Sequence, residues 1–277
     1  MTPPVPAWET GPVPAALPDA VHRSHLVDAA HGRAVFRLPV GRFLVTAGAT
    51  TVVEPAAGAS EEDITCMLRG PVGALRSSLA GHFALRASAV EVGGGALVVC
   101  GSTFGVSTLV ASLALRGHRL LADGVVVVSG NPPVVSALPE ADRPRVTLWP
   151  DSAEHLGLPW DQGQPLRPGV GSRLFALGPG GGPPHVTLGN LVMLGVDHNS
   201  RLPCKVTSAP TSGATRVASL VGHQWHAEVV TALGMQAEQF AWAVAACKVP
   251  VYRLQRSPGT MELTLPPLAQ RAEELAG

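Results

Sequence analysis

The sequence predicts an α/β fold, and one continuous stretch carries most of that prediction. ALVVCG (96–101) is typical of a buried strand, GSTFGV (101–106) of a tight loop, and STLVASLALRG (107–117) of a helix that ends at Gly117. HRLLADGVVVVSG (118–130) then has the composition of a further strand. Strand, loop, helix and strand in this order indicate the βαβ unit of a sheet with parallel strands.

Composition bounds the kind of protein. Hydrophobic residues make up 46% of the chain and charged residues 14%, which predicts a folded globular protein. The formal net charge is zero, so no long-range attraction to nucleic acid or anionic lipid is expected. The start, MTPPVPAWETGPVP, has no signal-peptide pattern, and no apolar run reaches about 18 residues. We expect a cytoplasmic protein with neither a nucleic-acid nor a membrane partner.

Four cysteines are spread along the sequence without a C-x-x-C pair. Their spacing predicts free thiols and neither a zinc cluster nor a disulfide framework. His223 and His226, three residues apart in a segment with helical periodicity (215–247), are expected to share a helical face. An H-x-x-H pair alone is weak evidence for a metal, so no metal site is predicted.

The expected domain organisation is simple. Residues 1–20 are rich in proline and predict a flexible tail, and residues 21–277 predict a single domain. Within it, 21–80 supplies the N-terminal strands and a helix, and 81–277 the core and the C-terminal elements.

The remaining elements follow from local patterns. Alternating strands are expected over 34–40, 41–48 and 50–55, and a helix from Ser60 to Leu79 in which Asp63 completes the start signal. Further strands and helices are expected at 84–92 (strand), within 145–160 (a short helix capped by Asp151 or Ser152), and at 186–197 (strand), 215–247 (helical), 249–256 (strand) and 271–277 (fraying end).

The stretch FALRASAVEVGGGALVVCGSTFGVSTLVASLALRGHRLLADGVVVV (83–128) resembles the core of the HPr serine kinase/phosphorylase family. FRLPVGRFLVTAG, LWPDSAEHLGL and VPVYRLQR are similar to its flanking segments, so the resemblance covers about residues 30 to 265. It implies a mixed-sheet α/β sandwich of the HPr kinase and phosphoenolpyruvate carboxykinase type with a P-loop. It also implies ATP- and Mg²⁺-dependent phosphorylation of a serine in a protein or peptide. Relatives in gene clusters for ribosomal peptide natural products are thought to act on a precursor peptide.

The sequence departs from this family at the positions that carry the chemistry. A P-loop wraps phosphates in backbone N–H groups, while its lysine neutralises the β and γ oxygens and a Ser or Thr holds Mg²⁺. Aligned on STL (107–109), the departures are Val106 for the lysine, Cys100 for the first glycine, an added Phe104, Gly124 for the second aspartate and Arg86 for the histidine of His-Ala-Ser.

These departures predict a catalytically degenerate member, because electrostatic positioning supplies most of phosphoryl-transfer catalysis. ATP and Mg²⁺ binding are expected to be weak or absent. The expected partner is a peptide or protein. The family resemblance implies a precursor peptide and its modifying enzyme, and by the same analogy a homo-oligomer. The alternative is an active enzyme, either an altered serine kinase or a different catalyst in the same pocket.

Arg86 and Asp123 are the weak catalytic candidates. Arg86 either holds a carboxylate or phosphate, or is simply an arginine at a strand start; Asp123 either keeps a metal or base role, or satisfies backbone donors in a turn. The hydroxyls near the loop either form an anion nest or cap the following helix. The candidate binding residues are Arg86, Gly101, Ser102, Thr103, Gly105, Ser107, Thr108 and Asp123.

Overall fold

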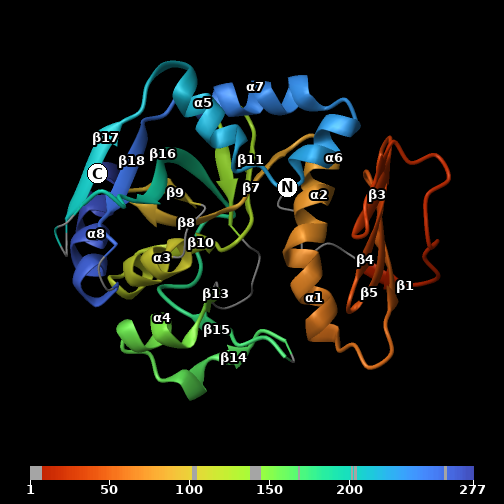
Figure 1. Cartoon of the computed structure of the whole chain (residues 1–277), viewed down its shortest axis with the longest axis horizontal. Helices are drawn as coiled ribbons and strands as arrows, with labels where there is room; N and C mark the ends of the chain where they lie inside the picture. Colours follow the sequence, from red (N-terminus) through yellow and green to blue (C-terminus); the bar gives the residue numbers. More distant parts are fainter. Residues whose placement is uncertain are drawn as a thin grey trace.

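A computed structural model gives the structure of the chain over residues 8–101, 105–137, 145–167, 169–200, 202, 205–258 and 261–277. It is a mixed α/β protein with three sheets, and helices cover both faces of the largest one (Figure 1). The predicted fold class is therefore confirmed at the level of a mixed-sheet α/β architecture. Within the described residues, no helix is long and apolar enough to cross a membrane.

The N-terminal sheet has the strand order β1-β6-β5-β4-β3-β2 and is antiparallel except for the parallel pair β1 and β6. Its strands are β1 (Trp8–Thr10), β2 (His22–Arg23), β3 (Val27–Ala30), β4 (Arg33–Leu38), β5 (Gly41–Thr46) and β6 (Thr51–Pro55). The prediction of a loose tail over residues 1–20 is wrong for residues 8–20. β1 is hydrogen-bonded into the sheet, and Val13 and Leu17 are buried because they cover the apolar side chains of Ala30 and Val35.

Two helices stand between this sheet and the rest of the molecule (Figure 1): α1 (Glu61–Arg69) and α2 (Pro71–Leu79). Ser60 and Asp63 form the predicted capping box at the start of α1. The single helix expected up to Leu79 is instead two, because Gly70 takes a non-helical conformation and Pro71 starts a new helix at its first position. Buried side chains of both helices pack against the N-terminal sheet.

The central sheet has the order β10-β8-β9-β16-β12-β11-β7, with β18 also paired to β16 and β17 to β18. Its strands are β7 (Phe83–Leu85), β8 (Ala87–Val92), β9 (Gly95–Gly101), β10 (Arg119–Ala122), β11 (Val126–Ser129), β12 (Val134–Ser136), β16 (His185–Val196), β17 (Val206–Pro210) and β18 (Val251–Arg256). β9, β16 and β18 run parallel, and the other pairs are antiparallel.

The predicted strand–loop–helix–strand order is present as β9, α3 (Val106–Leu115) and β10, with a difference in pairing. β8 lies between β9 and β10 and is antiparallel to both, so the two strands joined by α3 are not neighbours. The segment 118–130 is also two strands and not one. β10 ends at Ala122, and Gly124, with φ +79°, turns the chain away before β11.

Alternation along β9 sends its side chains into two separate cores. Ala96, Val98 and Cys100 face a core closed by α5 (Gly213–Val221) and α7 (Gln236–Ala246). Leu97 and Val99 face a second core, closed by α3 and α8 (Met261–Ala276). The expectation that 271–277 frays is wrong, since α8 stays helical to Ala276 and Ala272 is fully buried in the core shared with α3.

The helical segment predicted over 215–247 is broken into α5, α6 (Ala227–Ala232) and α7. His223 and His226 lie in the turn between α5 and α6, so they share no helical face. His226 has a left-handed backbone with φ 53°, and its Nε2–H donates to the Pro71 carbonyl at 2.7 Å. This turn fixes the position of Trp225, which faces the cleft described below.

A small third sheet completes the fold and has the order β13-β15-β14. Its strands and neighbouring helices are β13 (Arg145–Leu148), α4 (Pro150–His155), the 3-10 helix η1 (Trp160–Gln162), β14 (Gln164–Pro165) and β15 (Arg173–Ala176). The short helix predicted near Asp151 is α4, but its N-cap is Trp149 and neither Asp151 nor Ser152.

Candidate functional site

The site begins where β9 passes into α3. Gly105 precedes the first helical residue with φ +123°, a conformation that favours glycine, and Gly101 ends the strand. A Cβ on Gly101 would lie 2.8 Å from Val106 Cγ2 and 3.1 Å from the Leu194 carbonyl oxygen. The backbone is therefore closely packed here, and the half-buried Val106 side chain fills the space between strand and helix. Ser102, Thr103 and Phe104 lie outside the described residues.

Asp123 is the polar centre of the site. Its Oδ1 accepts hydrogen bonds from the hydroxyl of Ser88, at 2.6 Å, and of Ser107, at 2.8 Å. Its Oδ2 accepts from the backbone N–H of Thr147 at 2.9 Å. One carboxylate thus joins the end of β10 to β8, to the first turn of α3 and to β13.

Burial raises the pKa of Asp123, and the hydrogen bonds from Ser88, Thr147 and Ser107 oppose that rise. Among the described residues no arginine, lysine or histidine forms an ion pair with this carboxyl group, so the hydroxyl and N–H dipoles are what hold its charge. A buried carboxyl group with a raised pKa beside a cleft is a typical functional feature. The sequence predicted Asp123 and Ser107 as site residues, but not that they contact each other.

Arg86 lies between β7 and β8 and is exposed. Its backbone N–H donates to the His223 carbonyl at 2.7 Å, and its Nη2 lies 3.4 Å from the Gly222 carbonyl oxygen. No carboxylate of the described residues forms an ion pair with the guanidinium, and Arg86 borders the cavity described next. Together with burial, its charge lowers the pKa of His223.

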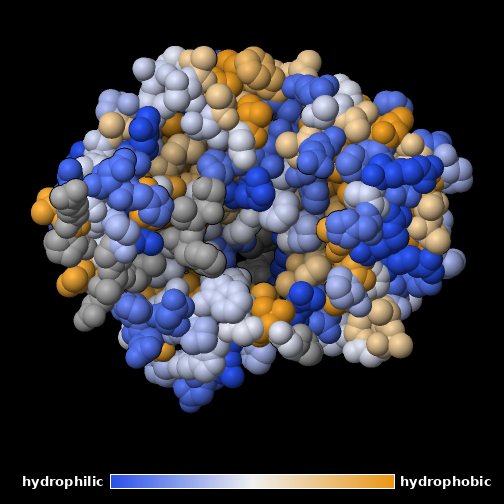
Figure 2. Space-filling model, viewed as in Figure 1, coloured by the Kyte–Doolittle hydropathy of each residue, from blue (hydrophilic) through white to orange (hydrophobic). Residues whose placement is uncertain are grey.

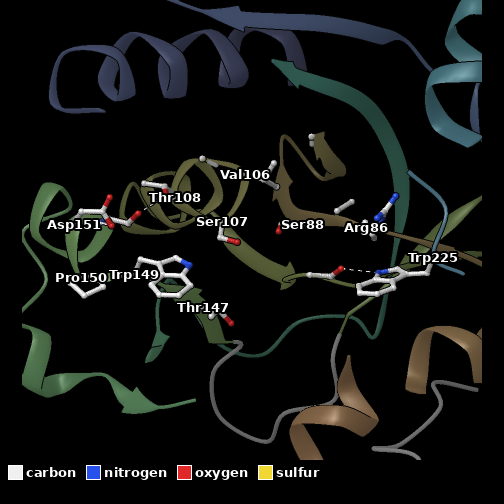
Figure 3. Close-up of a pocket in the computed structure, with 15 residues that line it drawn as sticks. Arg86, Ser88, Val106, Ser107, Thr108, Thr147, Trp149, Pro150, Asp151 and Trp225 are labelled. Atoms are coloured by element: carbon white, nitrogen blue, oxygen red, sulfur yellow. Dashed lines mark hydrogen bonds between the residues drawn. The ribbon is translucent and has the colours of Figure 1, made fainter. Parts of the chain in front are cut away.

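A cavity of about 980 Å³ joins these features (Figure 3). Trp149, just before α4, and Trp225, in the α5–α6 turn, lie on opposite sides of Ser107 in that view. Trp149 is half exposed, and Trp225 donates its indole N–H to the Gly124 carbonyl at 3.0 Å. The described lining residues are Arg86, Ala87, Ser88, Gly101, Gly105, Val106, Ser107, Thr108, Gly124, Thr147, Trp149, Pro150, Asp151, Ser152 and Trp225.

A second cavity of about 590 Å³ adjoins the first and shares Ser107, Gly124, Thr147 and Trp225 with it. It extends between α1 and β14, and Asp123 borders it. We refer to the two cavities together as the cleft. Figure 2 shows a hollow near the middle of the face in view. The shared residues show that the two cavities adjoin each other.

Most candidate residues with a described position come together in this cleft. Arg86, Gly101, Gly105, Ser107 and Thr108 line the first cavity, and Asp123 the second. Ser107 and Thr108 do not cap α3, because its N-cap is Gly105 and no side chain of the described residues bonds that helix end. Thr108 is buried and donates to Ser152 Oγ at 3.1 Å, which fastens α3 to α4.

Sequence reasoning missed the two indoles. Neither Trp149 nor Trp225 carried a functional prediction, because the pattern of residues around them does not indicate a binding site. The sequence does show that the chain has only two lysines, Lys205 and Lys248, and neither borders the cleft. No group of three or more His, Cys, Asp and Glu in the described part of the chain is placed to hold a metal ion.

Comparison with known proteins gives little. No family model matches the sequence, and no curated protein matches it. A solved structure, that of the Hpr(Ser) kinase/phosphatase from Coxiella burnetii, aligns with 69% of this chain and 87% of its own, at 16% identity and a TM-score of 0.32. A likeness of that size assigns no family, so the family resemblance seen in the sequence stays a prediction.

Proposed function

We propose that this chain binds a peptide or protein partner in the cleft and does not act as an ordinary phosphoryl-transfer enzyme. The observation that carries the proposal is the chemistry at the start of α3. Val106, at the position where the resemblance would place a lysine, is half-buried against Gly101. The two lysines of the chain lie elsewhere and border neither cavity.

The described residues fit a nucleoside triphosphate poorly. Its β and γ oxygens need a cation at the loop, and the described loop and first helical turn offer Gly101, Gly105 and Val106. Ser107, at the position that holds Mg²⁺ in the family, donates a hydrogen bond from its hydroxyl group to Asp123, so the poor fit rests on the missing cation. We therefore propose that Mg–ATP binds weakly or not at all, and no reaction step is assigned to it.

The cleft suits a peptide better. Arg86 offers a cation for an acidic side chain or a C-terminal carboxylate. Arginine can bind either carboxylate through two parallel hydrogen bonds. Trp149 and Trp225 offer apolar faces, and a few such anchors supply most of the affinity of a short peptide. The sequence resemblance suggests a biosynthetic precursor peptide, with its modifying enzyme as a further partner.

One observation favours the alternative of an active enzyme. Ser88 and Ser107 donate hydrogen bonds from their hydroxyl groups to one carboxylate oxygen of Asp123, and burial raises the pKa of that group. A poised carboxyl group next to hydroxyls is a resource for acid–base chemistry. This second candidate requires turnover of a substrate, whereas the first requires binding alone.

Two measurements separate the candidates. The first is fluorescence anisotropy with the labelled precursor peptide encoded beside this gene, using a scrambled peptide as control. The second is isothermal calorimetry with ATP, with and without Mg²⁺, followed by mass spectrometry of the peptide. Binding of the peptide without any mass change supports the proposal. Micromolar affinity for Mg–ATP together with a phosphorylated serine would overturn it, and no binding to the peptide or to proteins encoded nearby would refute the partner.

A further inference from the structure

Helix α7 is apolar on two opposite faces. One face is buried, with Ala243 and Ala246 packed toward the central sheet, and Trp242 donates its indole N–H to the Gly81 carbonyl at 2.8 Å. The buried polar side chain on this face, Gln239, is hydrogen-bonded to Gln224 and to the His82 carbonyl. After the first turn, which exposes Gln236 and Glu238, the exposed residues of the helix are all apolar. A surface helix of a monomer normally places charged and polar residues there.

The exposed stripe consists of Ala237, Phe240, Ala241 and Val244, all exposed to solvent. Their spacing, 0, 3, 4 and 7, places them along one line of the helix surface. Phe240 is 57% exposed and Val244 42% exposed, which makes them two of the few large apolar side chains on the described surface. Figure 2 shows hydrophobic atoms gathered at the top of the molecule, where α7 lies in Figure 1.

We propose that this stripe is the interface of a symmetric dimer, in which α7 packs antiparallel against α7 of a second copy. An interface on a two-fold axis must be complementary to itself. The stripe meets that requirement, because Ala241 lies level with Val244 of the facing helix and Ala245 lies level with its Phe240. Alternation of small and large side chains is how helices interdigitate at close range.

Charge at the two ends of the stripe favours the antiparallel arrangement. Glu238 is exposed near the N-terminal end of α7, and Lys248 is exposed just past its C-terminal end. With the two-fold axis midway between Ala241 and Val244, Lys248 of one copy comes level with residues 237 and 238 of the other. A parallel pairing would instead bring the two lysines together.

Two further observations favour a second copy over other occupants. The formal net charge of the chain is zero, so two copies do not repel each other at long range. Within α7 itself there is no lysine or arginine, whereas helices that lie on anionic membranes carry basic residues beside the apolar face. None of the described residues that border the cleft comes from α7, so both copies keep the cleft open.

The test is the mass of the chain in solution as its concentration changes. Light scattering after size exclusion and sedimentation velocity should show a dimer in a series up to about 100 µM, a range that covers the weak affinities of small interfaces. Phe240→Glu should raise the dissociation constant about a hundredfold or more, because the change falls twice in a symmetric interface. Leu115→Glu, at an exposed leucine of α3, is the matched control and should leave the dimer unchanged.

The orientation has its own test. Glu238→Lys should weaken the dimer about threefold, and adding Lys248→Glu should restore it. Circular dichroism verifies that each variant is folded. A wild-type chain that stays monomeric over the whole series, including one that binds anionic vesicles instead, would overturn the proposal. So would an unchanged dimer in Phe240→Glu, and failure of the second charge change to restore affinity would overturn the antiparallel pairing.

Discussion

Ser107 donates a hydrogen bond from its Oγ to Oδ1 of Asp123 at 2.8 Å, across 16 positions of sequence. The serine comes from the first turn of α3 and the aspartate from the end of β10, two strands away from the strand that enters the helix. Because Ser88 donates to the same oxygen, the pair ties three elements together at the centre of the cleft. The protonation state of Asp123 therefore matters for both the fold and the function.

The first prediction concerns that protonation. Burial raises the pKa of Asp123 and the Ser107 hydroxyl group lowers it, so Ser107→Ala should move the pKa further upward. Carbon-13 NMR of the carboxyl group, followed against pH, should show the wild-type group titrating above the ordinary aspartate value of about 3.9. The variant should titrate at a higher pH still.

Ser152→Ala is the matched control for this titration. Ser152 also borders the first cavity, but its hydroxyl group accepts from Thr108 and does not contact Asp123. Its replacement should leave the midpoint unchanged. A wild-type midpoint at or below the ordinary value would show that Asp123 is better solvated than its buried position indicates.

The second prediction concerns recognition of the partner. Arg86→Ala should weaken binding of the precursor peptide at least tenfold, because truncating one member of a desolvated arginine–carboxylate pair costs on the order of 2–5 kcal/mol. Fluorescence anisotropy measures the change. Arg116→Ala is a suitable control, since Arg116 forms an ion pair with Glu273 at 2.8 Å and borders neither cavity. Equal affinities of Arg86→Ala and wild type for the peptide would show that the peptide is a partner but that it binds at a site away from Arg86.

The third prediction is that Val106→Lys alone does not create a kinase. Gly124 and Arg86 still stand where the family resemblance places an aspartate and a histidine, and the new side chain leaves the packing against Gly101. Mg–ATP calorimetry and a peptide phosphorylation assay should both stay negative. Full phosphate transfer by this single variant would mean that the lysine is the one element missing.

The fourth prediction tests the close contact at the start of α3. Gly101→Ala should lower the free energy of unfolding by about 1–3 kcal/mol, because its Cβ would press on Val106 Cγ2 and on the Leu194 carbonyl oxygen. Adding Val106→Ala removes one of these two contacts and should recover part of the loss. Urea unfolding measures both. The steric account would be contradicted if the double variant lost more unfolding free energy than the two single variants lose when their losses are added.

The fifth prediction concerns the N-terminal sheet and acid. The Asp28 carboxylate is nearly buried, accepts from Arg37 at 2.7 Å, and also bonds the Leu17 N–H and Arg23. The hydrogen bond from Arg37 is the main reason why the pKa of Asp28 lies below its ordinary value. Asp28→Asn should therefore cost about 1–3 kcal/mol of unfolding free energy at pH 7, measured by urea titration.

The sign of the pH dependence follows from the lowered pKa. The stability that ionised Asp28 contributes is fully present above its unfolded pKa of about 3.9, and it is lost as the pH falls through the lower folded value. The gap between wild type and Asp28→Asn should therefore close in acid. Asp19→Asn, at an exposed carboxylate paired with Arg33, is the control and should change stability little at any pH. A gap that persists below the folded pKa would point to a packing effect and not to charge.

Local sequence signals predicted local structure well where propensity and packing agree. The capping box at Ser60, the buried strand 96–101 and the helix after Gly105 all occur as expected. The failures share a cause. Residues 8–20 and the C-terminal segment carry no strong local pattern, yet both are ordered because apolar side chains such as Leu17 and Leu268 find a surface to cover. Such contacts are between residues far apart in sequence, and no window of neighbouring residues contains them.

The sequence by itself determined the α/β class, the position of the glycine-bounded loop before α3, and the lack of any lysine in it. These properties depend on residue type and on spacing within one segment. Only the tertiary structure decided that β8 separates β9 from β10, that Asp123 contacts Ser88 and Ser107, and that Trp225 reaches the cleft. Each of these depends on how distant elements pack, and packing is set by side-chain shape and buried area that a linear pattern does not record.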